Sequence, residues 1–202
     1  MRQGEALGLR WQYVDLDAGD IRVWWQLRRR QFEHGCGSTC GRTRGGNCPQ
    51  RWLPTRSGET VLEDGFVMKE PKGKSRRTIP LPAELVDQLR THRRTQGIER
   101  ALAGDRYVDH DLVFARPDGR PIDPAEDHAE WKSILPELGI AEARLHDARH
   151  TAATTLLALG VSASVVQEIL GHSDIRVTQG YLHVASEMAR AATSRIGNAL
   201  LG

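Results

Sequence analysis

Long apolar runs are missing from this sequence, although 39% of its 202 residues are hydrophobic. No stretch reaches the roughly 20 apolar residues that a membrane-spanning helix needs. The first residues also lack the basic, apolar and small-residue regions of a secretory signal peptide. These two absences argue against a membrane protein and a secreted one, and we expect the chain to be cytoplasmic.

A large charge of one sign is missing as well. The chain has 28 Lys and Arg residues against 26 Asp and Glu residues, which gives a net charge of +2 with neutral histidines. The protein is therefore not a polycation, and a nucleic-acid-binding surface would require arginines to gather on one side. The length suits one hydrophobic core, so we expect residues 1–202 to form a single domain.

Cysteine is scarce, and the three cysteines lie close together in the sequence. An odd, local set in a cytoplasmic chain argues against a disulfide framework and favours metal ligands or free thiols. Together with His34, the residues Cys36, Cys40 and Cys48 offer one imidazole and three thiolates, the ligand set of a closed tetrahedral zinc site. The alternative is a mobile, metal-free loop with idle cysteines, which the lack of a second C-x-x-C pair favours.

Local patterns predict short strands and longer helices. Residues 21–27 alternate apolar and polar side chains, and residues 65–82 resemble two short strands joined by a turn. Residues 28–64 are rich in Gly, Cys, Arg and Pro without a hydrophobic period, and we expect a long loop insertion there. A further short strand is expected at 112–115, and helical patterns predict helices over 82–95, from 123 onward and over 151–159.

The most informative stretch covers residues 145–183. His146 and Arg149 stand three positions apart at the head of a helical run, so both can project from one face and hold an anion. Glycines end that helix and a second short one, directly before His172. Tyr181 follows nine positions later. Nine residues at about 100° each would place His172 and Tyr181 on opposite sides of one helix, so a shared site requires the helix to restart between them.

The ordered set H-x-x-R, then G-H, then Y-x-H resembles the catalytic core of the tyrosine recombinase, or phage integrase, family. A lone H-x-x-R would mean little, but the complete set with helices of suitable length between its parts is a specific signal. The resemblance implies an α+β fold, a mostly helical catalytic domain with a small antiparallel β-sheet. It also implies that Tyr181 is the nucleophile and that His146, Arg149 and His172 are catalytic.

The resemblance extends to the start of the chain and to the predicted strand pair. Arg2 and Glu5 fit the family's R-x-x-E box, with Arg2 as a catalytic arginine and Glu5 as the carboxylate that orients it. Lys72 stands eight residues before Pro80, which is the spacing of the family's hairpin lysine, and Lys74 is the alternative. The remaining assignments are supporting positions at Glu5, His150 and His183, and DNA contacts at Lys74, Arg76 and Arg77.

The resemblance implies a reaction without a metal. Arg2 and Arg149 would hold fixed positive charge beside the phosphate, where negative charge increases in the transition state. Tyr181 would attack phosphorus to leave a 3′-phosphotyrosine, His146 would accept the phenolic proton, and Lys72 would protonate the departing 5′ oxygen. A second 5′-hydroxyl can then reverse the attack, which permits strand exchange.

We therefore expect site-specific cleavage and rejoining of double-stranded DNA by a chain that is monomeric alone and tetrameric with other protomers on DNA. The family's N-terminal core-binding domain is expected to be lacking, because the sequence starts one residue before Arg2. No cofactor is expected for catalysis, and a structural zinc would be separate from it. Two alternatives are a catalytically inactive DNA-binding remnant and a type IB topoisomerase that relaxes DNA.

Overall fold

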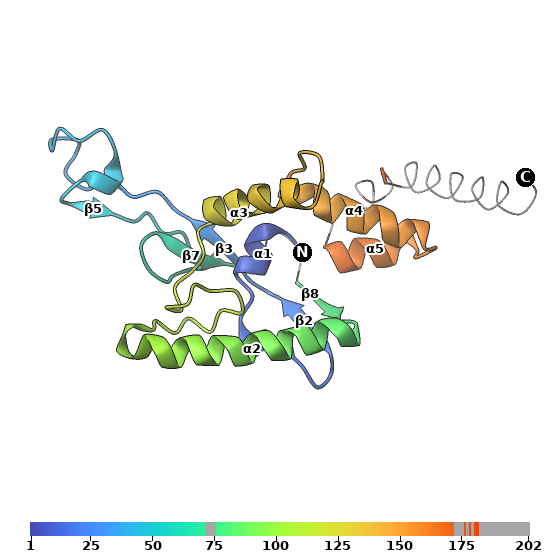
Figure 1. Ribbon diagram of the computed structural model, residues 1–202. Coiled ribbons are helices and arrows are strands. Elements are labelled where there is room, and N and C mark those ends of the chain that lie inside the picture. Colours follow the sequence, from blue (N-terminus) through green and yellow to red (C-terminus); the bar gives the residue numbers. More distant parts are fainter. Residues whose placement is uncertain (72–75, 172–175, 177, 179, 182–202) are drawn as a thin grey trace, which may run out of the picture.

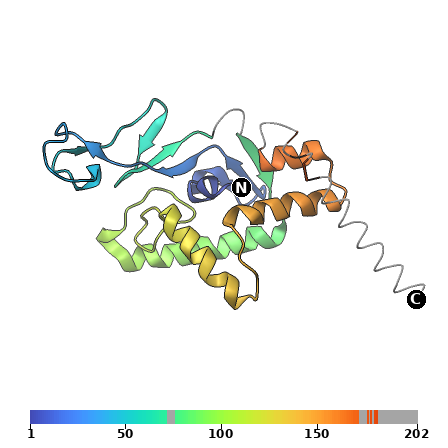
Figure 2. The same ribbon diagram turned by 90° about the horizontal axis from the view of Figure 1, so that it is seen from above.

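A computed structural model describes residues 1–71, 76–171, 176, 178, 180 and 181. Within them the fold is α+β, as the sequence predicts. The helices are α1 (Gln3–Leu7), α2 (Ala83–Ala103), α3 (Pro124–Glu137), α4 (Leu145–Ala158) and α5 (Ala163–Leu170). Figures 1 and 2 show that α4 and α5 lie at one end of the molecule, and that a β-rich region projects from the other end.

Short antiparallel strands make up three sheets in the described part of the chain. The strands are β1 (Val14–Asp15), β2 (Asp20–Val23), β3 (Gln26–Arg29), β4 (Glu33–His34), β5 (Arg51–Trp52), β6 (Glu59–Val61), β7 (Phe66–Lys69) and β8 (Arg77–Pro80). One sheet has the order β1-β2-β8 and a second the order β3-β7-β6, while β4 and β5 pair with each other. The predicted strands β7 and β8 are therefore present, but they belong to different sheets.

Residues 21–27 do not form one strand, contrary to the sequence prediction. β2 ends at Val23 and β3 begins at Gln26, in a different sheet. The chain divides here because the segment contributes to two cores. Val23 packs with Leu9 in one hydrophobic cluster, whereas Leu27 packs in another with residues of α1 and β7.

The segment 28–64 contains more regular structure than a long loop. β3 continues to Arg29 and pairs with one edge of β7, while β6 pairs with the other edge. The segment thus leaves a sheet and returns to it. The part between these strands, residues 30–58, projects away from the helices and holds β4, β5 and a 3-10 turn (Gly45–Asn47), and we call it the extension (Figure 1).

Helix α2 continues to Ala103 instead of ending near residue 95. Gln96 explains the extra length, because this buried side chain accepts a hydrogen bond from Trp11 Nε1 at 2.6 Å. Its amide nitrogen also lies 3.1 and 3.3 Å from carbonyl oxygens in residues 112–115, to which it donates. Those residues form only isolated bridges, so the strand expected there is not observed in the described chain.

Helices α4 and α5 form the end of the molecule that carries the candidate site. α4 begins at Leu145, earlier than residue 151, and therefore includes His146 and Arg149 in its first turns. Within the described residues, no helix combines the length and apolar character that a membrane crossing requires. The two helices pack through a small buried cluster made of Ala153, Leu157, Val166 and Leu170.

Candidate active site

An open cavity of about 520 Å³ lies between the start of the chain and helix α4. Its lining includes Arg2, His146 and Arg149, three of the residues that the sequence predicts to be catalytic. Arg2 is the residue immediately before α1, and the other two lie on α4. Leu170, the last residue of α5, also lines the cavity. The start of the chain therefore meets α4 and α5, which are neighbours in the sequence but distant from α1.

Glu5 is the buried acidic residue of this site, with only 1% of its side chain exposed. Its Oε1 accepts a hydrogen bond from Arg2 at 2.9 Å, and its Oε2 accepts one from Arg77 at 2.8 Å. Burial by itself would raise the pKa of Glu5, but the hydrogen bonds from Arg77 and Arg2 outweigh burial and hold this pKa at about 2. The carboxylate is therefore ionised at neutral pH and fixes both guanidinium groups.

The carboxyl end of α5 gathers three arginines. The last carbonyls of a helix lack partners within it and carry partial negative charge, so they attract cationic donors. A side chain at Gly171 would crowd this arrangement, since its Cβ would lie 2.6 Å from a guanidinium nitrogen of Arg77. Three consecutive carbonyls each accept one hydrogen bond: Ile169 from Arg77 at 2.8 Å, Leu170 from Arg149 at 2.5 Å, and Gly171 from Arg2 at 3.0 Å.

Arg149 is 6% exposed, but its Nη1 atom has no hydrogen-bond partner among the residues that the structure describes. Burial and then the nearby charge of Arg2 lower the pKa of Arg149 to about 10, so the guanidinium remains protonated at neutral pH. A buried cationic donor without a partner is costly. In a cavity that also contains Arg2, this donor indicates a binding position for an anion.

Tyr181 lies beside α4, where its hydroxyl oxygen is 2.5 Å from Nδ1 of His150. The ring of His150 meets that of His146 edge to face, with 4.7 Å between the ring centroids. Burial, and then the positive charges nearby, lower the pKa of His146, so its neutral form predominates at pH 7. The phenol of Tyr181 therefore contacts the imidazole of His150, which in turn contacts the imidazole of His146. His146 also lines the cavity.

The structure places His150 in direct contact with Tyr181, whereas the sequence analysis assigned His150 only a supporting position. We expected this residue to support the site and His146 to accept the phenolic proton, but the hydroxyl of Tyr181 contacts His150. Residues four apart share a helix face. The spacing of His146 and His150 could therefore have placed both rings together, a signal that the sequence analysis did not use.

The structure also corrects the location of Arg77. It was expected to contact DNA, but only 4% of its side chain is exposed and it forms an ion pair with Glu5. Neighbouring side chains of an extended segment point to opposite faces, so Arg76 is the exposed one and pairs with Glu70 at 2.5 Å. The remaining predicted site residues, Lys72, Lys74, His172 and His183, lie outside the described residues.

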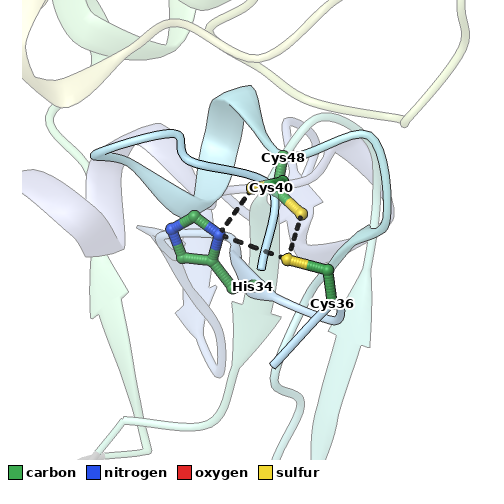
Figure 3. Close-up of side chains that lie close together, drawn as sticks. All are labelled: His34, Cys36, Cys40 and Cys48. Carbon is green, nitrogen blue, oxygen red and sulfur yellow. Dashed lines mark hydrogen bonds between the residues drawn. The ribbon is translucent and has the colours of Figure 1, made fainter. Parts of the chain in front are cut away.

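A second group of reactive side chains lies in the extension, at the opposite end of the molecule from α5 (Figures 1 and 2). One ligand atom from each of its four members lies within 4.8 Å of all the others, and this group could hold a metal ion. Figure 3 shows the side chains converging on one point: His34, Cys36, Cys40 and Cys48.

Comparison with known proteins identifies the family. The model of the phage integrase family matches residues 56–188. An integrase of Saccharopolyspora erythraea is 38% identical over the whole of this chain. A XerC-like tyrosine recombinase of Caldanaerobacter subterraneus subsp. tengcongensis is 30% identical over 98% of the chain. The protein therefore belongs to the phage integrase family, also called the tyrosine recombinases. The chain spans 51% and 46% of the lengths of these two relatives.

Solved structures support the fold. The XerA recombinase matches 96% of this chain with a TM-score of 0.60 and 22% identity, over 52% of its own length. The Tn1549 transposon integrase, in complex with transposon right end DNA, matches 98% of this chain with a TM-score of 0.62 and 19% identity, over 55% of its own length. This chain therefore has the fold of tyrosine recombinase catalytic domains.

Proposed function

We propose that this chain is the catalytic domain of a site-specific DNA recombinase that cleaves and rejoins strands through a covalent 3′-phosphotyrosine. The observation that supports the proposal most strongly is that Nη1 of buried Arg149 has no hydrogen-bond partner among the described residues, in a cavity shared with Arg2. A scissile phosphate in this position would supply the missing acceptor. Both guanidinium groups are already fixed, by Glu5 and by the end of α5, so they would not need to reorganise during the reaction.

The proposed reaction begins at Tyr181. Its hydroxyl oxygen forms a bond to phosphorus, the bond to the 5′ oxygen breaks, and the phenolic proton passes to Nδ1 of His150, which is 2.5 Å away. A phenol has an ordinary pKa near 10, so a base in contact with it is needed at neutral pH. The departing 5′ oxygen takes a proton from Lys72, with Lys74 as the alternative donor.

Three further histidines would assist the reaction. His146, neutral at pH 7 and on the cavity wall, would form a hydrogen bond to the phosphate. Its edge-to-face contact would also hold the ring of His150 in place. His172 would add a second hydrogen bond to the phosphate, and His183 would support Tyr181. No metal takes part in these steps. Attack by a second 5′-hydroxyl on the phosphotyrosine restores the tyrosine and rejoins the DNA.

The proposed substrate is double-stranded DNA. One matching structure is the Tn1549 integrase in complex with transposon right end DNA, and another is the XerH site-specific recombinase bound to a palindromic difH substrate. We propose that this chain acts in the cytoplasm, is monomeric in free solution and assembles as a tetramer on DNA. With a net charge of only +2, its DNA affinity should be modest and should fall steeply with salt.

A covalent-capture experiment tests the proposal without knowledge of the target site. The 202-residue chain is incubated with nicked duplexes that carry a randomised region, the mixture is denatured, and DNA attached to protein is sequenced. Recombinase activity predicts adducts enriched in one sequence, linked through Tyr181. Absence of adducts despite DNA binding would identify an inactive remnant, and relaxation of supercoiled DNA without sequence preference would identify a topoisomerase.

A further inference from the structure

The extension has a defined fold without a hydrophobic core. Between residues 30 and 64, all of which the structure describes, Cys48 is the one buried residue. Trp52, a large apolar side chain on β5, is 50% exposed. The pairing of β4 with β5 involves only two residues from each strand. A two-stranded hairpin is marginal in water without further support, so another interaction must stabilise this region.

The one buried residue belongs to the histidine and cysteine cluster. Nδ1 of His34 lies 3.4 Å from Sγ of Cys40 and 3.9 Å from Sγ of Cys36, and Sγ of Cys48 lies 3.4 Å from Sγ of Cys36. Around a zinc ion with bonds of about 2.0 Å to nitrogen and 2.3 Å to sulfur, tetrahedral ligands are roughly 3.5–3.8 Å apart. These three spacings are close to the edges of that tetrahedron, and all four ligand atoms lie within 4.8 Å of one another (Figure 3).

The main chain around the cluster is shaped to bring these atoms together. Gly37 and Ser38 have φ values of 60° and 67°, so the chain reverses between Cys36 and Cys40. Gly45, at the start of the 3-10 turn before Cys48, passes so close to β4 that an added Cβ would lie 2.2 Å from the nearest main-chain oxygen. The turn that supplies the last thiol is therefore packed directly against the strand that carries the imidazole.

We propose that His34, Cys36, Cys40 and Cys48 bind one structural zinc ion in a closed tetrahedral site. Three thiolates and one imidazole are a ligand set that suits zinc and leaves no open position for catalysis. Binding forms three Zn–S bonds and one Zn–N bond, and each thiol that is still protonated releases its proton to solvent. The ion replaces the missing hydrophobic core and fixes β4, the 3-10 turn and β5 to one another.

Zinc content gives the first test. The 202-residue chain is produced without an affinity tag and without chelator, and zinc is measured per chain by mass spectrometry. About one equivalent is expected in the wild type and in a control variant, Arg42→Ala, which changes an exposed side chain of the same loop. Cys40→Ser and Cys48→Ser should retain less than about 0.2 equivalents, since each removes one of four ligands.

Cobalt substitution gives a second test on the wild-type chain, in case a cysteine variant fails to fold. Tetrahedral, sulfur-rich coordination predicts intense d–d absorption and a sulfur-to-cobalt charge-transfer band. A weak octahedral spectrum would overturn the proposal. So would three freely titrating thiols in zinc-free, folded protein, or a disulfide between Cys36 and Cys48. None of these outcomes would affect the proposed DNA cleavage, which uses no metal.

Discussion

The candidate active-site cavity and the extension both gather reactive side chains, but the first does so through contacts between distant segments and the second through residues that are close in the sequence. The cavity is lined by residues from α1, α3, α4 and α5. The ion pair that fixes its Arg2, Glu5 with Arg77 of β8, is almost fully buried. The extension draws its four proposed ligands from residues 34–48, and only Cys48 is buried. A site built from long-range contacts can be fixed by the protein alone, whereas we expect the local site on an exposed segment to depend on the proposed zinc ion.

The largest expected effect concerns the cavity. Tyr181→Phe should abolish covalent DNA adducts while leaving the fold and DNA affinity nearly unchanged, because only the attacking oxygen is lost. Adducts are scored after denaturation on a gel. Tyr107→Phe, which removes a phenolic hydroxyl that does not line the cavity, is the control and should behave as wild type. Adducts that persist in Tyr181→Phe would show that another residue attacks the phosphate.

Loss of Arg149 should be nearly as severe. Arg149→Ala removes the unpartnered donor from the cavity, and loss of one such donor typically slows a reaction by about 100-fold or more. Single-turnover rates of adduct formation provide the measurement. Arg149→Lys retains the charge but not the forked geometry, so its rate should lie between those of the wild type and Arg149→Ala. Arg100→Ala, at an exposed ion pair with Asp109, should leave the rate unchanged. An equally unaffected rate in Arg149→Ala would move the phosphate site elsewhere.

Glu5 allows the buried network to be tested through stability. Glu5→Gln should lower the free energy of unfolding by about 3 kcal/mol, because Arg77 would remain buried without its anionic partner. The exposed pair of Glu126 with Arg116 offers a matched control, and Glu126→Gln should cost less than about 1 kcal/mol. Chemical denaturation of the variants measures both values. Equal losses of unfolding free energy in the two variants would contradict the larger contribution expected of the buried Glu5.

The lowered pKa of Glu5 also predicts the direction of a pH effect. Its pKa is about 2 in the folded chain and 4.5 in the reference state. The stability that this carboxylate contributes is therefore fully present above about pH 4.5 and is lost as the pH falls towards 2. Denaturation curves across this window should show a steeper loss in the wild type than in Glu5→Gln. Parallel curves would mean that the ion pair does not contribute.

The smallest effect on catalysis is expected from metal removal. A chelator should increase hydrogen exchange in β4 and β5, because the extension has no other core, while exchange in α4 and α5 stays the same. Adduct formation by the chelated protein should match that of the untreated protein. Increased exchange at both ends of the molecule would show that the two regions are coupled, and the contrast between them would then fail.

Much of this protein could be inferred from short sequence spacings. The set formed by His146, Arg149, His172 and Tyr181 indicated the family, which the family comparison confirmed. The α+β class was implied by that resemblance, while local periodicity predicted individual strands and helices, since these repeat at different intervals along the chain. The proximity of the histidine and cysteine ligands could likewise be predicted, because all four lie within residues 34–48.

Only the tertiary structure decided which side chains became buried and which atoms met. Arg77 and Arg76 are adjacent and chemically identical, but β8 turns only Arg77 towards Glu5 and α5. The division of residues 21–27 between two sheets depends on two separate hydrophobic clusters. The approach of Arg2, Arg77 and Arg149 to one another depends on the carbonyls at the end of α5 that have no partner within the helix. These outcomes arise from contacts between segments distant in the sequence. Local patterns therefore determined the elements and the motif, and long-range packing determined the geometry of the site.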